Sequence, residues 1–340
     1  MGEICLTPKG QDFTMSATHS TEPQISAIIC THNRDRYLAK AIDSLLIQTC
    51  ENYEILIIDN ASTDRTAEVA QAYLNNPRVR YHYEDKVGLS VARNTGAQLA
   101  TSPLIAYLDD DAIASPQWLQ TFIDAYAQDP KLAISGGKVT LIWDCVQPRW
   151  ISENLSGNLG FYDLGDRPVK IDQPGLTPRG LNYAIRRTFL DQVGGFDLNL
   201  GRVGKNLLSN EELHMTNLAL QSGWNVSYLP NAIAGHHVAP ERVKRSWFLE
   251  RGWWQGISEC YREEIAGEAG FGQLGRGGER LLRGLYKSVK LTIQGKFIPK
   301  SHVSAEGLVF ENLVYSYGQI AYLLKVCEGL SPLSKSTGKG

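Results

Sequence analysis

Three consecutive carboxylates stand at the end of a short apolar run. Asp109, Asp110 and Asp111 directly follow the segment LIAYL. Carboxylates this close together repel one another strongly unless a cation neutralises them or water solvates them fully. Mg²⁺ and Mn²⁺ prefer oxygen ligands and commonly keep coordination positions for substrate phosphates. The triplet therefore predicts a divalent-metal site, and an exposed acidic turn is the alternative.

A second acidic pair opens a predicted helix in the segment SNEELHMTNLALQSGW. Glu211 and Glu212 stand at the first turn of that helix, where the positive end of the helix dipole favours ionised carboxylates. A carboxylate in such a place can also act as a general base if the proton it removes is within hydrogen-bond reach. Simple charge complementarity at the helix start is the alternative interpretation.

An arginine and two histidines are further candidates. Arg93, in GLSVARN, can form a bidentate clamp on a diphosphate, or it can pair at the helix surface with Glu84 or Asp85. His236 and His237 are adjacent and follow LPNAIAG. Neighbouring residues of a strand point to opposite faces, so at most one of the two histidines can reach a metal.

The elements that must position these residues alternate between strand and helix. The segments ISAIIC, EILIID, VRYHY and LIAYL are short and β-branched or apolar, and YLAKAIDSLLIQ, RTAEVAQAYL and GLSVARNTGAQLA have helical patterns. This alternation predicts a doubly wound α/β sheet. Ligands of such sheets bind beyond the carboxyl ends of the strands. We therefore expect residues 31–36, 59–64 and 109–111 to lie together.

The second half of the chain is less regular. LAISGGKVTLIW predicts a pair of strands, and residues 148–178 predict a long loop that holds substrate. Beyond Pro240, residues 241–330 predict an α-helical appendage, and residues 1–23 and 331–340 predict flexible tails. The glycines of residues 267–278 include a dinucleotide-binding spacing, but no strand precedes them, so we interpret them as a flexible linker.

Composition excludes some classes of protein. The chain has 340 residues and a formal net charge of −2, which gives no overall field for nucleic acid. The cysteines form no CxxC pair, and no leader or long apolar span is visible, so we predict a cytoplasmic protein.

One predicted helix, residues 279–293, has two stripes. One stripe is basic and the other apolar, which predicts peripheral contact with the inner face of an anionic membrane. A packed surface helix with a solvated basic face is the alternative. The basic stripe is Arg280, Arg283, Lys287 and Lys290, and the apolar stripe is Leu282, Tyr286, Val289 and Ile293.

Four segments together carry a family resemblance. CTHNRDRYL, IDNASTD, GLSVARNTG and LDDDA, in this order, resemble the nucleotide-sugar-binding half of the inverting glycosyltransferases of family 2. The resemblance covers about two thirds of the chain and implies the GT-A fold, a doubly wound mixed sheet flanked by helices. It implies a catalytic domain over residues 24–240, with nucleotide-sugar binding in 24–115 and the acceptor side and catalytic base in 116–240.

The resemblance also implies roles for single residues. Asp111, Asp109 and His237 would bind Mn²⁺ or Mg²⁺, and Glu212, or else Glu211, would be the catalytic base. The reaction would move a sugar from a nucleotide-diphosphate donor to a hydroxyl of a glycan or lipid-linked acceptor, in polysaccharide, glycolipid or cell-envelope glycan synthesis. The donor nucleotide would be bound by Thr31, His32, Asn33, Arg34, Asp59, Asn60, Gly88, Arg93, Asp109 and Asp110.

Two alternatives and the identity of the donor base stay open. Asn60 stands where a carboxylate is commoner, which leaves a thymidine or guanosine donor open. A nucleotidyltransferase would carry a glycine-rich first loop, which CTHNRDR lacks. A non-catalytic carbohydrate-binding protein of the same fold would not need the acids at 109–111 and 211–212.

Overall fold

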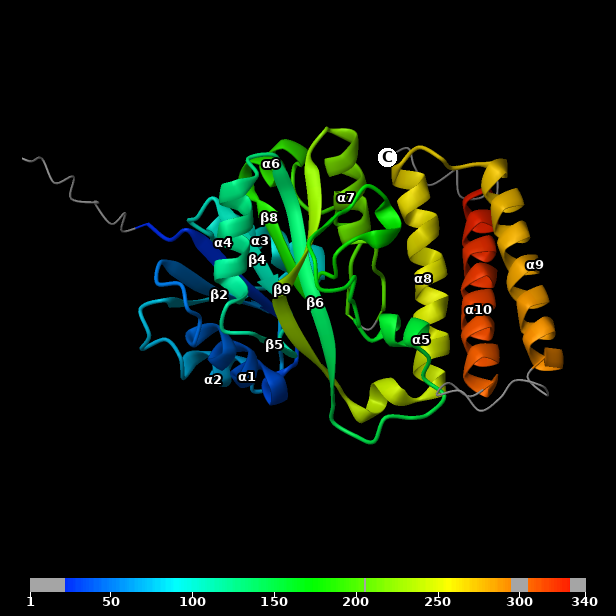
Figure 1. Ribbon diagram of the computed structural model, residues 1–340, viewed down its shortest axis with the longest axis horizontal. Coiled ribbons are helices and arrows are strands. Elements are labelled where there is room, and N and C mark those ends of the chain that lie inside the picture. The colour runs from blue at the N-terminus through cyan, green and yellow to red at the C-terminus, as the bar shows by residue number, and fades with distance from the viewer. Residues whose placement is uncertain (1–21, 205, 295–304, 331–340) are drawn as a thin grey trace, which may run out of the picture.

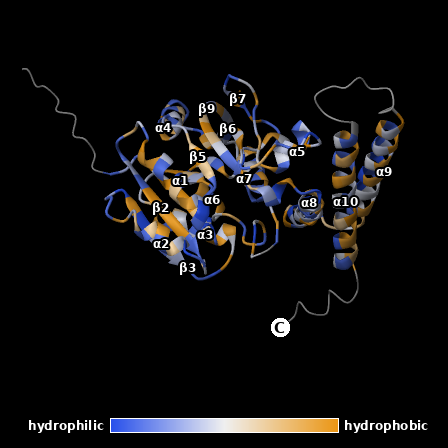
Figure 2. Ribbon diagram, turned by 90° about the horizontal axis from the view of Figure 1, so that it is seen from below, coloured by the Kyte–Doolittle hydropathy of each residue, from blue (hydrophilic) through white to orange (hydrophobic). Residues whose placement is uncertain are grey.

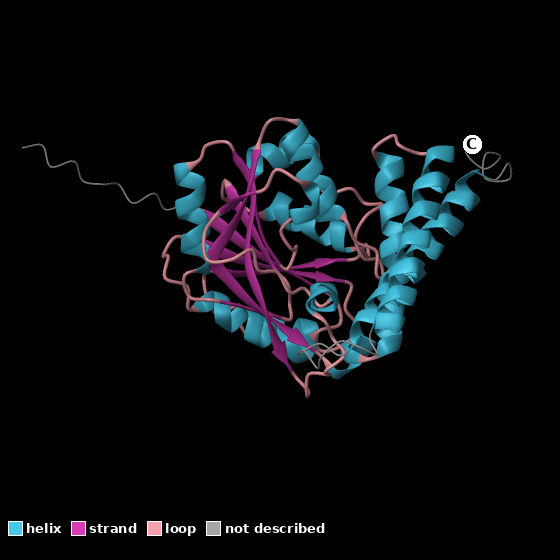
Figure 3. Cartoon of the chain, turned by 45° about the vertical axis from the view of Figure 1, so that its right-hand side comes forward, coloured by secondary structure: helices cyan, strands magenta, loops and turns pink. Residues whose placement is uncertain are grey.

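The computed structural model describes residues 22–204, 206–294 and 305–330, so most of the two predicted tails lies outside it. An α/β body with one central sheet is followed by a layer of long C-terminal helices (Figure 1). Helices cover both faces of the sheet (Figure 3). The predicted fold class, a mixed sheet flanked by helices with a helical appendage, is confirmed.

The first half alternates strand and helix as predicted. Its four strands pair in the order β3-β2-β1-β4, and all three pairings are parallel. Helices cover both faces of these strands, so nearly continuous apolar runs suit them. Every residue of β2 is buried. The elements are β1 (Ile25–Thr31), α1 (Asp35–Leu46), β2 (Tyr53–Asn60), α2 (Thr66–Gln71), β3 (Val79–Glu84), α3 (Leu89–Leu99) and β4 (Leu104–Leu108).

The second half extends the same sheet with mixed pairing. The order continues from β4 through β8, β6 and β9 to β5, and only β6 and β9 pair in parallel along this stretch. The short β7 pairs with β9. The elements are β5 (Ala112–Ala114), α4 (Trp118–Gln128), β6 (Leu132–Trp143), α5 (Glu153–Asn158), β7 (Val169–Lys170), β8 (Asn182–Arg186), α6 (Arg187–Val193), α7 (Glu211–Gln221) and β9 (Asn225–Val238).

One strand corrects the sequence prediction. LAISGGKVTLIW is a single strand of 12 residues, β6, and not a pair of strands. Its two glycines allow a close approach rather than a turn: a Cβ on Gly137 would lie 1.7 Å from the carbonyl oxygen of Ala232 on β9. The pairing of β6 with β9 shifts register between Gly137 and Val139. A glycine pair inside a strand here marks a bulge.

The C-terminal layer contains α8 (Arg245–Ile265), α9 (Phe271–Gln294) and α10 (Ala305–Leu330). In Figures 1 and 2, α10 lies between α8 and α9, and α8 lies next to the α/β body. Glycines bring α8 and α10 very close, since a Cβ on Gly256 would lie 1.9 Å from the carbonyl oxygen of Gly318. Over the residues described, none of the helices combines the length and apolar character that crossing a bilayer requires.

The predicted flexible linker is also corrected. Helix α9 begins at Phe271, so most of the glycines of residues 267–278 belong to its first turns. Gly267 and Gly270 have positive φ angles of 75° and 138° and form the turn before α9. Gly277 packs against α10, where a Cβ would lie 2.7 Å from Leu323 Cδ2. Close helix contact explains why this helix tolerates glycine.

Candidate active site

A cavity of about 530 Å³ opens at the carboxyl ends of β1, β2 and β4. Loops of the second half and helix α8 line its other sides. The three loops that the sequence predicts to converge do so, because β1 and β2 pair in register from Ile25 with Tyr53 to Thr31 with Asp59. Among the polar lining residues are Thr31, His32, Arg34, Asn60, Asp109, Asp110, Glu211 and Glu212.

The acidic triplet lies where β4 ends. Asp109 and Asp110 line the cavity, while Asp111 lies behind them and is buried. Burial, followed by the charge of Asp111, raises the pKa of Asp110 to about 7. Burial also acts to raise the pKa of Asp111, but His236 and Arg242 outweigh it and hold that pKa well below its usual range. The triplet is therefore not a solvated surface turn.

His236 reaches the triplet through strand pairing. Ala112, the residue after the triplet, lies opposite His236 in the antiparallel pair β5–β9. His236 Nε2 is 3.0 Å from Asp111 Oδ1, and Arg242 Nη2 is 3.0 Å from Asp111 Oδ2. Ligand atoms of Asp109, Asp111 and His236 all lie within 4.8 Å of one another.

The donor set of this cluster fits a divalent cation. His236 Nδ1 lies 2.6 Å from the carbonyl oxygen of Leu159, so Nδ1 carries the proton and Nε2 faces the cluster. In the neutral ring, the form that binds a metal, Nε2 has a donor neighbour, Arg242 Nη1 at 3.1 Å, and an acceptor neighbour, Asp111 Oδ1 at 3.0 Å, which repels its lone pair. A cation between Asp111 and His236 would satisfy both ligand atoms. Two carboxylates and an imidazole suit Mn²⁺ or Mg²⁺.

The structure places His237 outside this cluster. Its Nδ1 donates to Asp144 Oδ1 at 2.8 Å, on the other face of β9. The expected alternation of adjacent histidines therefore holds, but His236 and not His237 lies with the aspartates. His236 replaces His237 as the candidate metal ligand.

The first two loops contribute part of the predicted donor set. His32 Nδ1 donates to the carbonyl oxygen of Asn60 at 2.6 Å, and Arg34 Nε is 3.8 Å from Asp110 Oδ1. The side chain of Asn60 donates to the carbonyl oxygen of Lys86 and accepts from the backbone nitrogen of Gly88. Asn60 thereby fixes the segment that leads into α3, and a carboxylate there could not donate to Lys86.

Two predicted donor residues do not line the cavity. Asn33 Oδ1 accepts from the backbone nitrogen of Thr63 at 2.7 Å, which joins the first loop to the second. Asp59 is fully buried, and its carboxylate accepts from Tyr81 Oη and from the backbone nitrogen of Ser62. Both side chains hold the loops in place instead of facing the space where a ligand would bind.

Arg93 joins the two acidic regions of the site. Its side chain is 3% exposed, and its Nη1 and Nη2 lie 3.0 Å from Glu211 Oε1 and Glu212 Oε1. It contacts neither of the acids, Glu84 and Asp85, that the sequence suggested as surface partners. Both terminal nitrogens of this guanidinium are therefore committed to the glutamates and do not form a free clamp.

The two glutamates differ in their access to the cavity. The Glu211 side chain is 4% exposed and that of Glu212 is 16% exposed. Burial, and then the neighbouring charge of Glu212, raises the pKa of Glu211 to about 7. Gly180 makes room for Glu212, because a Cβ there would lie 1.7 Å from Glu212 Oε1.

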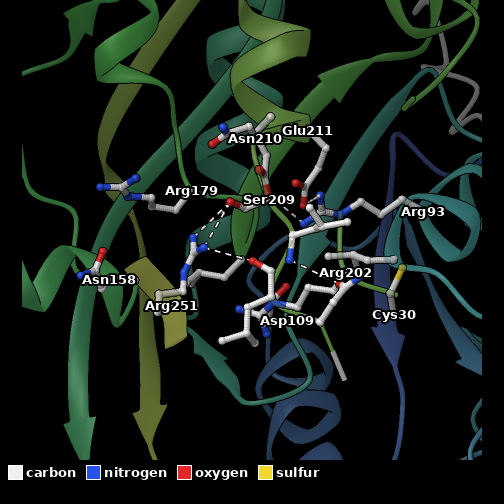
Figure 4. Close-up of a pocket in the computed structure, with 18 of the residues that line it drawn as sticks. Cys30, Arg93, Asp109, Asn158, Arg179, Arg202, Ser209, Asn210, Glu211 and Arg251 are labelled. Atoms are coloured by element: carbon white, nitrogen blue, oxygen red, sulfur yellow. Dashed lines mark hydrogen bonds and ion pairs between the residues drawn. The ribbon is translucent and has the colours of Figure 1, made fainter. Parts of the chain in front are cut away.

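Sequence reasoning did not single out four arginines of the cavity wall. Arg179, Arg202, Arg242 and Arg251 all line it, and Arg179, Arg202 and Arg251 are labelled in Figure 4. Arg179 and Arg202 stand in irregular segments, where no periodicity indicates their direction. A signal did exist for Arg251, because Trp247, Arg251 and Gln255 follow one another at the four-residue spacing of one helix face, and all three line the cavity.

A mixed sheet of this order, with an acidic cluster at the end of β4 and a second acidic pair across the same cavity, defines a sugar-nucleotide transferase of the GT-A fold. A family model described as glycosyl transferase family 2 matches residues 26–193. Residues 26–193 belong to glycosyltransferase family 2, and the chain is a glycosyltransferase.

Two curated relatives show the range of the likeness. A glucosyl-dolichyl phosphate glucuronosyltransferase of Haloferax volcanii is 29% identical over 242 residues, which are 69% of this chain and 76% of that protein. A validoxylamine A glucosyltransferase of Streptomyces hygroscopicus is 38% identical over 117 residues, which are 33% of this chain. The matched segment spans only 26% of that second relative.

Solved structures support the fold. A mannosyltransferase of Pyrobaculum calidifontis in complex with GDP-Man and Mn²⁺ has a TM-score of 0.53 at 17% identity, covering 94% of this chain and 77% of that one. GalNAc-T7 with UDP, GalNAc and Mn²⁺ has a TM-score of 0.51 at 17% identity, covering 71% and 50%.

Proposed function

We propose that this chain is an inverting glycosyltransferase that moves a sugar from a nucleotide-diphosphate donor to a hydroxyl of a lipid-linked glycan. The observation that carries the proposal is that Asp109 and Glu212 line one cavity. An in-line displacement at the anomeric carbon requires a metal site for the diphosphate and a general base for the acceptor hydroxyl in the same cavity. We call the sides of the cavity near Asp109 and Glu212 the metal end and the base end. The Haloferax volcanii relative, named for a glucosyl-dolichyl phosphate acceptor, supports the choice of acceptor.

We assign the donor end to the residues around β1, β2 and β4. Thr31, His32, Asn60 and Gly88 border the space for the nucleoside. Asp109, Asp111 and His236 would hold Mn²⁺ or Mg²⁺, which when bound neutralises charge on the departing diphosphate. Arg34 and Arg242 line the same end and add positive charge. The solved neighbours with Mn²⁺ are consistent with this choice of ion.

We assign the base to Glu212. It is the more accessible of the two glutamates, and its carboxylate is oriented by Arg93. In the proposed step, Glu212 removes the proton of the acceptor hydroxyl while that oxygen forms the new bond to the anomeric carbon. The bond from that carbon to the diphosphate oxygen breaks, and the diphosphate leaves with the electron pair on the opposite face. Glu211, more deeply buried, positions Arg93.

The division of labour follows the chain. Residues 24–115 would bind the donor, and residues 116–240 would bind the acceptor and supply the base. The helical region 241–330 would complete the acceptor side, because α8 places Trp247, Arg251 and Gln255 on the cavity wall.

Nucleotide binding tests the donor assignment. Thermal shifts would be measured for UDP, GDP and dTDP with and without Mn²⁺, since a ligand stabilises the fold that binds it. We expect one base to give a Mn²⁺-dependent shift and Asp111→Asn to remove it. Asp124→Asn, an exposed carboxylate on α4, should leave the shift unchanged. A full Mn²⁺-dependent shift in Asp111→Asn would contradict the assignment.

We also propose that α9 rests on an anionic membrane surface at the cytoplasmic face. Four apolar residues of its outer stripe, Leu282, Tyr286, Val289 and Ile293, are 59–69% exposed. Arg280 and Arg283 pair with Glu259 and Glu279, so Lys287 and Lys290 supply most of the positive charge. We expect the protein to co-sediment with phosphatidylserine vesicles and not with phosphatidylcholine vesicles. Lys287→Glu with Lys290→Glu should abolish this binding, and retained binding would contradict it.

A further inference from the structure

The cavity holds more arginines than its carboxylates neutralise. Six arginines line it: Arg34, Arg93, Arg179, Arg202, Arg242 and Arg251. Three of them have a carboxylate partner, which is Asp110 for Arg34, the two glutamates for Arg93 and Asp111 for Arg242. Within the part of the chain that the structure describes, Arg179, Arg202 and Arg251 have no carboxylate within 4.0 Å.

Arg202 and Arg179 both lie close enough to Arg251 to repel its charge. Loss of bulk water, followed by the charge of Arg202, lowers the pKa of Arg251 to about 10, and Arg179 acts in the same direction. Arg251 is held in this place by hydrogen bonds from its Nη1 and Nη2 to Ser209 Oγ, both 3.3 Å long, and by one of 3.1 Å to the carbonyl oxygen of Leu207. In Figure 4, Arg179 and Arg251 lie on the side of the pocket away from Arg93 and Cys30, and Arg251 points toward Ser209.

The guanidinium of Arg179 is available to a ligand. Its side chain is exposed toward the cavity, and its guanidinium carbon lies 5.4 Å from the centre of the Tyr162 ring. No acceptor for its side-chain nitrogens occurs among the described residues. An arginine stacked on an aromatic ring keeps its donor edge free, which favours bidentate recognition of an oxyanion.

The position of this group separates it from the metal end. The acidic neighbours that act on Arg251 are Glu211 and Glu212, and the one that acts on Arg179 is Glu212. Arg202 lies between the two ends, because Arg242, Asp109 and Asp111 act on it as well. The donor diphosphate assigned to the metal end therefore leaves Arg179 and Arg251 unneutralised beside the base. Positive charges gathered in a partly desolvated space are unfavourable until an anion joins them.

We propose that Arg179 and Arg251, with Arg202 at their border, form a second anion subsite that binds a phosphate group of the acceptor. The inference rests on the proposed function and deepens it, since it names a phosphorylated sugar as the acceptor class. A phosphate offers enough oxygens for two guanidinium forks, whereas one carboxylate is filled by a single bidentate arginine. The phosphate of a lipid-linked sugar would thus place the acceptor hydroxyl beside Glu212.

Calorimetry on the complete chain tests the subsite. The protein is first saturated with Mn²⁺ and with whichever of UDP, GDP and dTDP gives the largest thermal shift, which fills the donor end. It is then titrated with glucose 1-phosphate, glucose and glucuronic acid. We expect glucose 1-phosphate to bind at least about 10-fold more tightly than either of the others, as charge-assisted hydrogen bonds provide.

Matched variants assign the binding to the arginines. Arg179→Gln and Arg251→Gln should each weaken glucose 1-phosphate at least about 10-fold and leave nucleoside diphosphate binding within about 2-fold. Arg65→Gln, which removes an exposed arginine that does not line the cavity, should change neither. Melting temperatures would show that all three variants fold.

Each other outcome contradicts the inference. Equal binding of glucose and glucose 1-phosphate would exclude a phosphate subsite. Tighter binding of glucuronic acid would show a site for a carboxylated sugar instead. Loss of nucleoside diphosphate binding in Arg179→Gln would place the arginine at the donor. Failure of the proposed function is seen separately, because Mn²⁺-dependent nucleoside diphosphate binding is measured before any sugar is added.

Discussion

The half of the molecule to which we assign the donor and the half to which we assign the acceptor place their polar residues by different means. In residues 24–115, most cavity residues stand within a few positions of the end of β1, β2, β3 or β4, which pair in parallel, and Ala92 and Arg93 lie on α3. In the acceptor half, Arg179 and Arg202 come from irregular segments, and Arg251 comes from a helix beyond the sheet. The edge of a parallel sheet suits a group of constant shape, such as a diphosphate, whereas loops suit an acceptor that varies between enzymes.

The largest expected effect is the loss of kcat when Glu212 is replaced, because it separates catalysis from donor binding. Replacing Glu212 by Gln should lower kcat by about 10³-fold, because an amide cannot take the proton of the acceptor hydroxyl. Nucleoside diphosphate binding should stay unchanged, since the donor half is intact. Steady-state kinetics and calorimetry on the same preparation measure the two quantities. A kcat within 10-fold of the parent would mean that Glu212 is not the base.

A smaller loss of activity is expected when Glu212 is displaced but kept. Gly180→Ala would put a methyl group 1.7 Å from the present position of Glu212 Oε1. We expect kcat to fall by roughly 10-fold to 100-fold, because a carboxylate moved by about 1 Å loses its alignment. Gly275→Ala is the control, since this glycine does not line the cavity and nothing lies within 4 Å of its added Cβ. Equal kinetics of the two variants would show that the tight packing at Gly180 does not set the geometry of the base.

The appended helices can be perturbed without touching the donor half. Gly256→Ala would drive a Cβ to within 1.9 Å of the carbonyl oxygen of Gly318 and should lower the free energy of unfolding by about 1–3 kcal/mol. Gly278→Ala, a helical glycine with open space around it, should raise it by roughly 0.5–1 kcal/mol. Thermal melting compares the two. Similar melting temperatures would mean that the α8–α10 contact adapts easily.

The last effect concerns pH. Because burial raises the pKa of Glu211 from 4.5 to about 7, the folded protein binds a proton there that the unfolded chain releases. Stability from this group is full below about pH 4.5 and is lost as the pH rises through 7. Glu211→Gln removes that loss. Between pH 5 and pH 8, the free energy of unfolding of the variant relative to the parent should therefore rise by on the order of 2 kcal/mol, and its relative melting temperature should rise with it. A constant difference across this range would contradict the raised pKa.

The sequence predicted the donor half well because its signals are local. Strand, loop and helix alternate there, and parallel pairing forces the loops after β1, β2 and β4 to one edge. The positions of Asp109, Asp110 and Arg34 on the cavity wall follow from this. Asn33 and Asp59 could not be excluded from the same wall, because which way a loop side chain turns depends on partners such as Thr63 and Tyr81.

The rest depended on contacts between distant segments. The choice of His236 over His237 required the register of β9 against β5, which no local pattern encodes. Arg93 and the two glutamates are more than a hundred positions apart and were each assigned separately. Gly136 and Gly137 of β6 and Gly277 of α9 lie in segments that predict a turn or a linker, because a sequence does not show when glycine serves close packing.

Helix α8 borders the cavity and packs against α10. In 21 residues without a break, it turns Arg251 toward the acceptor side and Gly252 and Gly256 toward α10. A helix of this length behaves as a stiff rod. If α9 and α10 rest on a surface, α8 would fix the distance and the angle between that surface and the opening of the cavity. The height of the cavity above that surface would then depend on the glycine contacts between α8 and α10, at Gly252, Gly256 and Gly318, and not on the residues of the site.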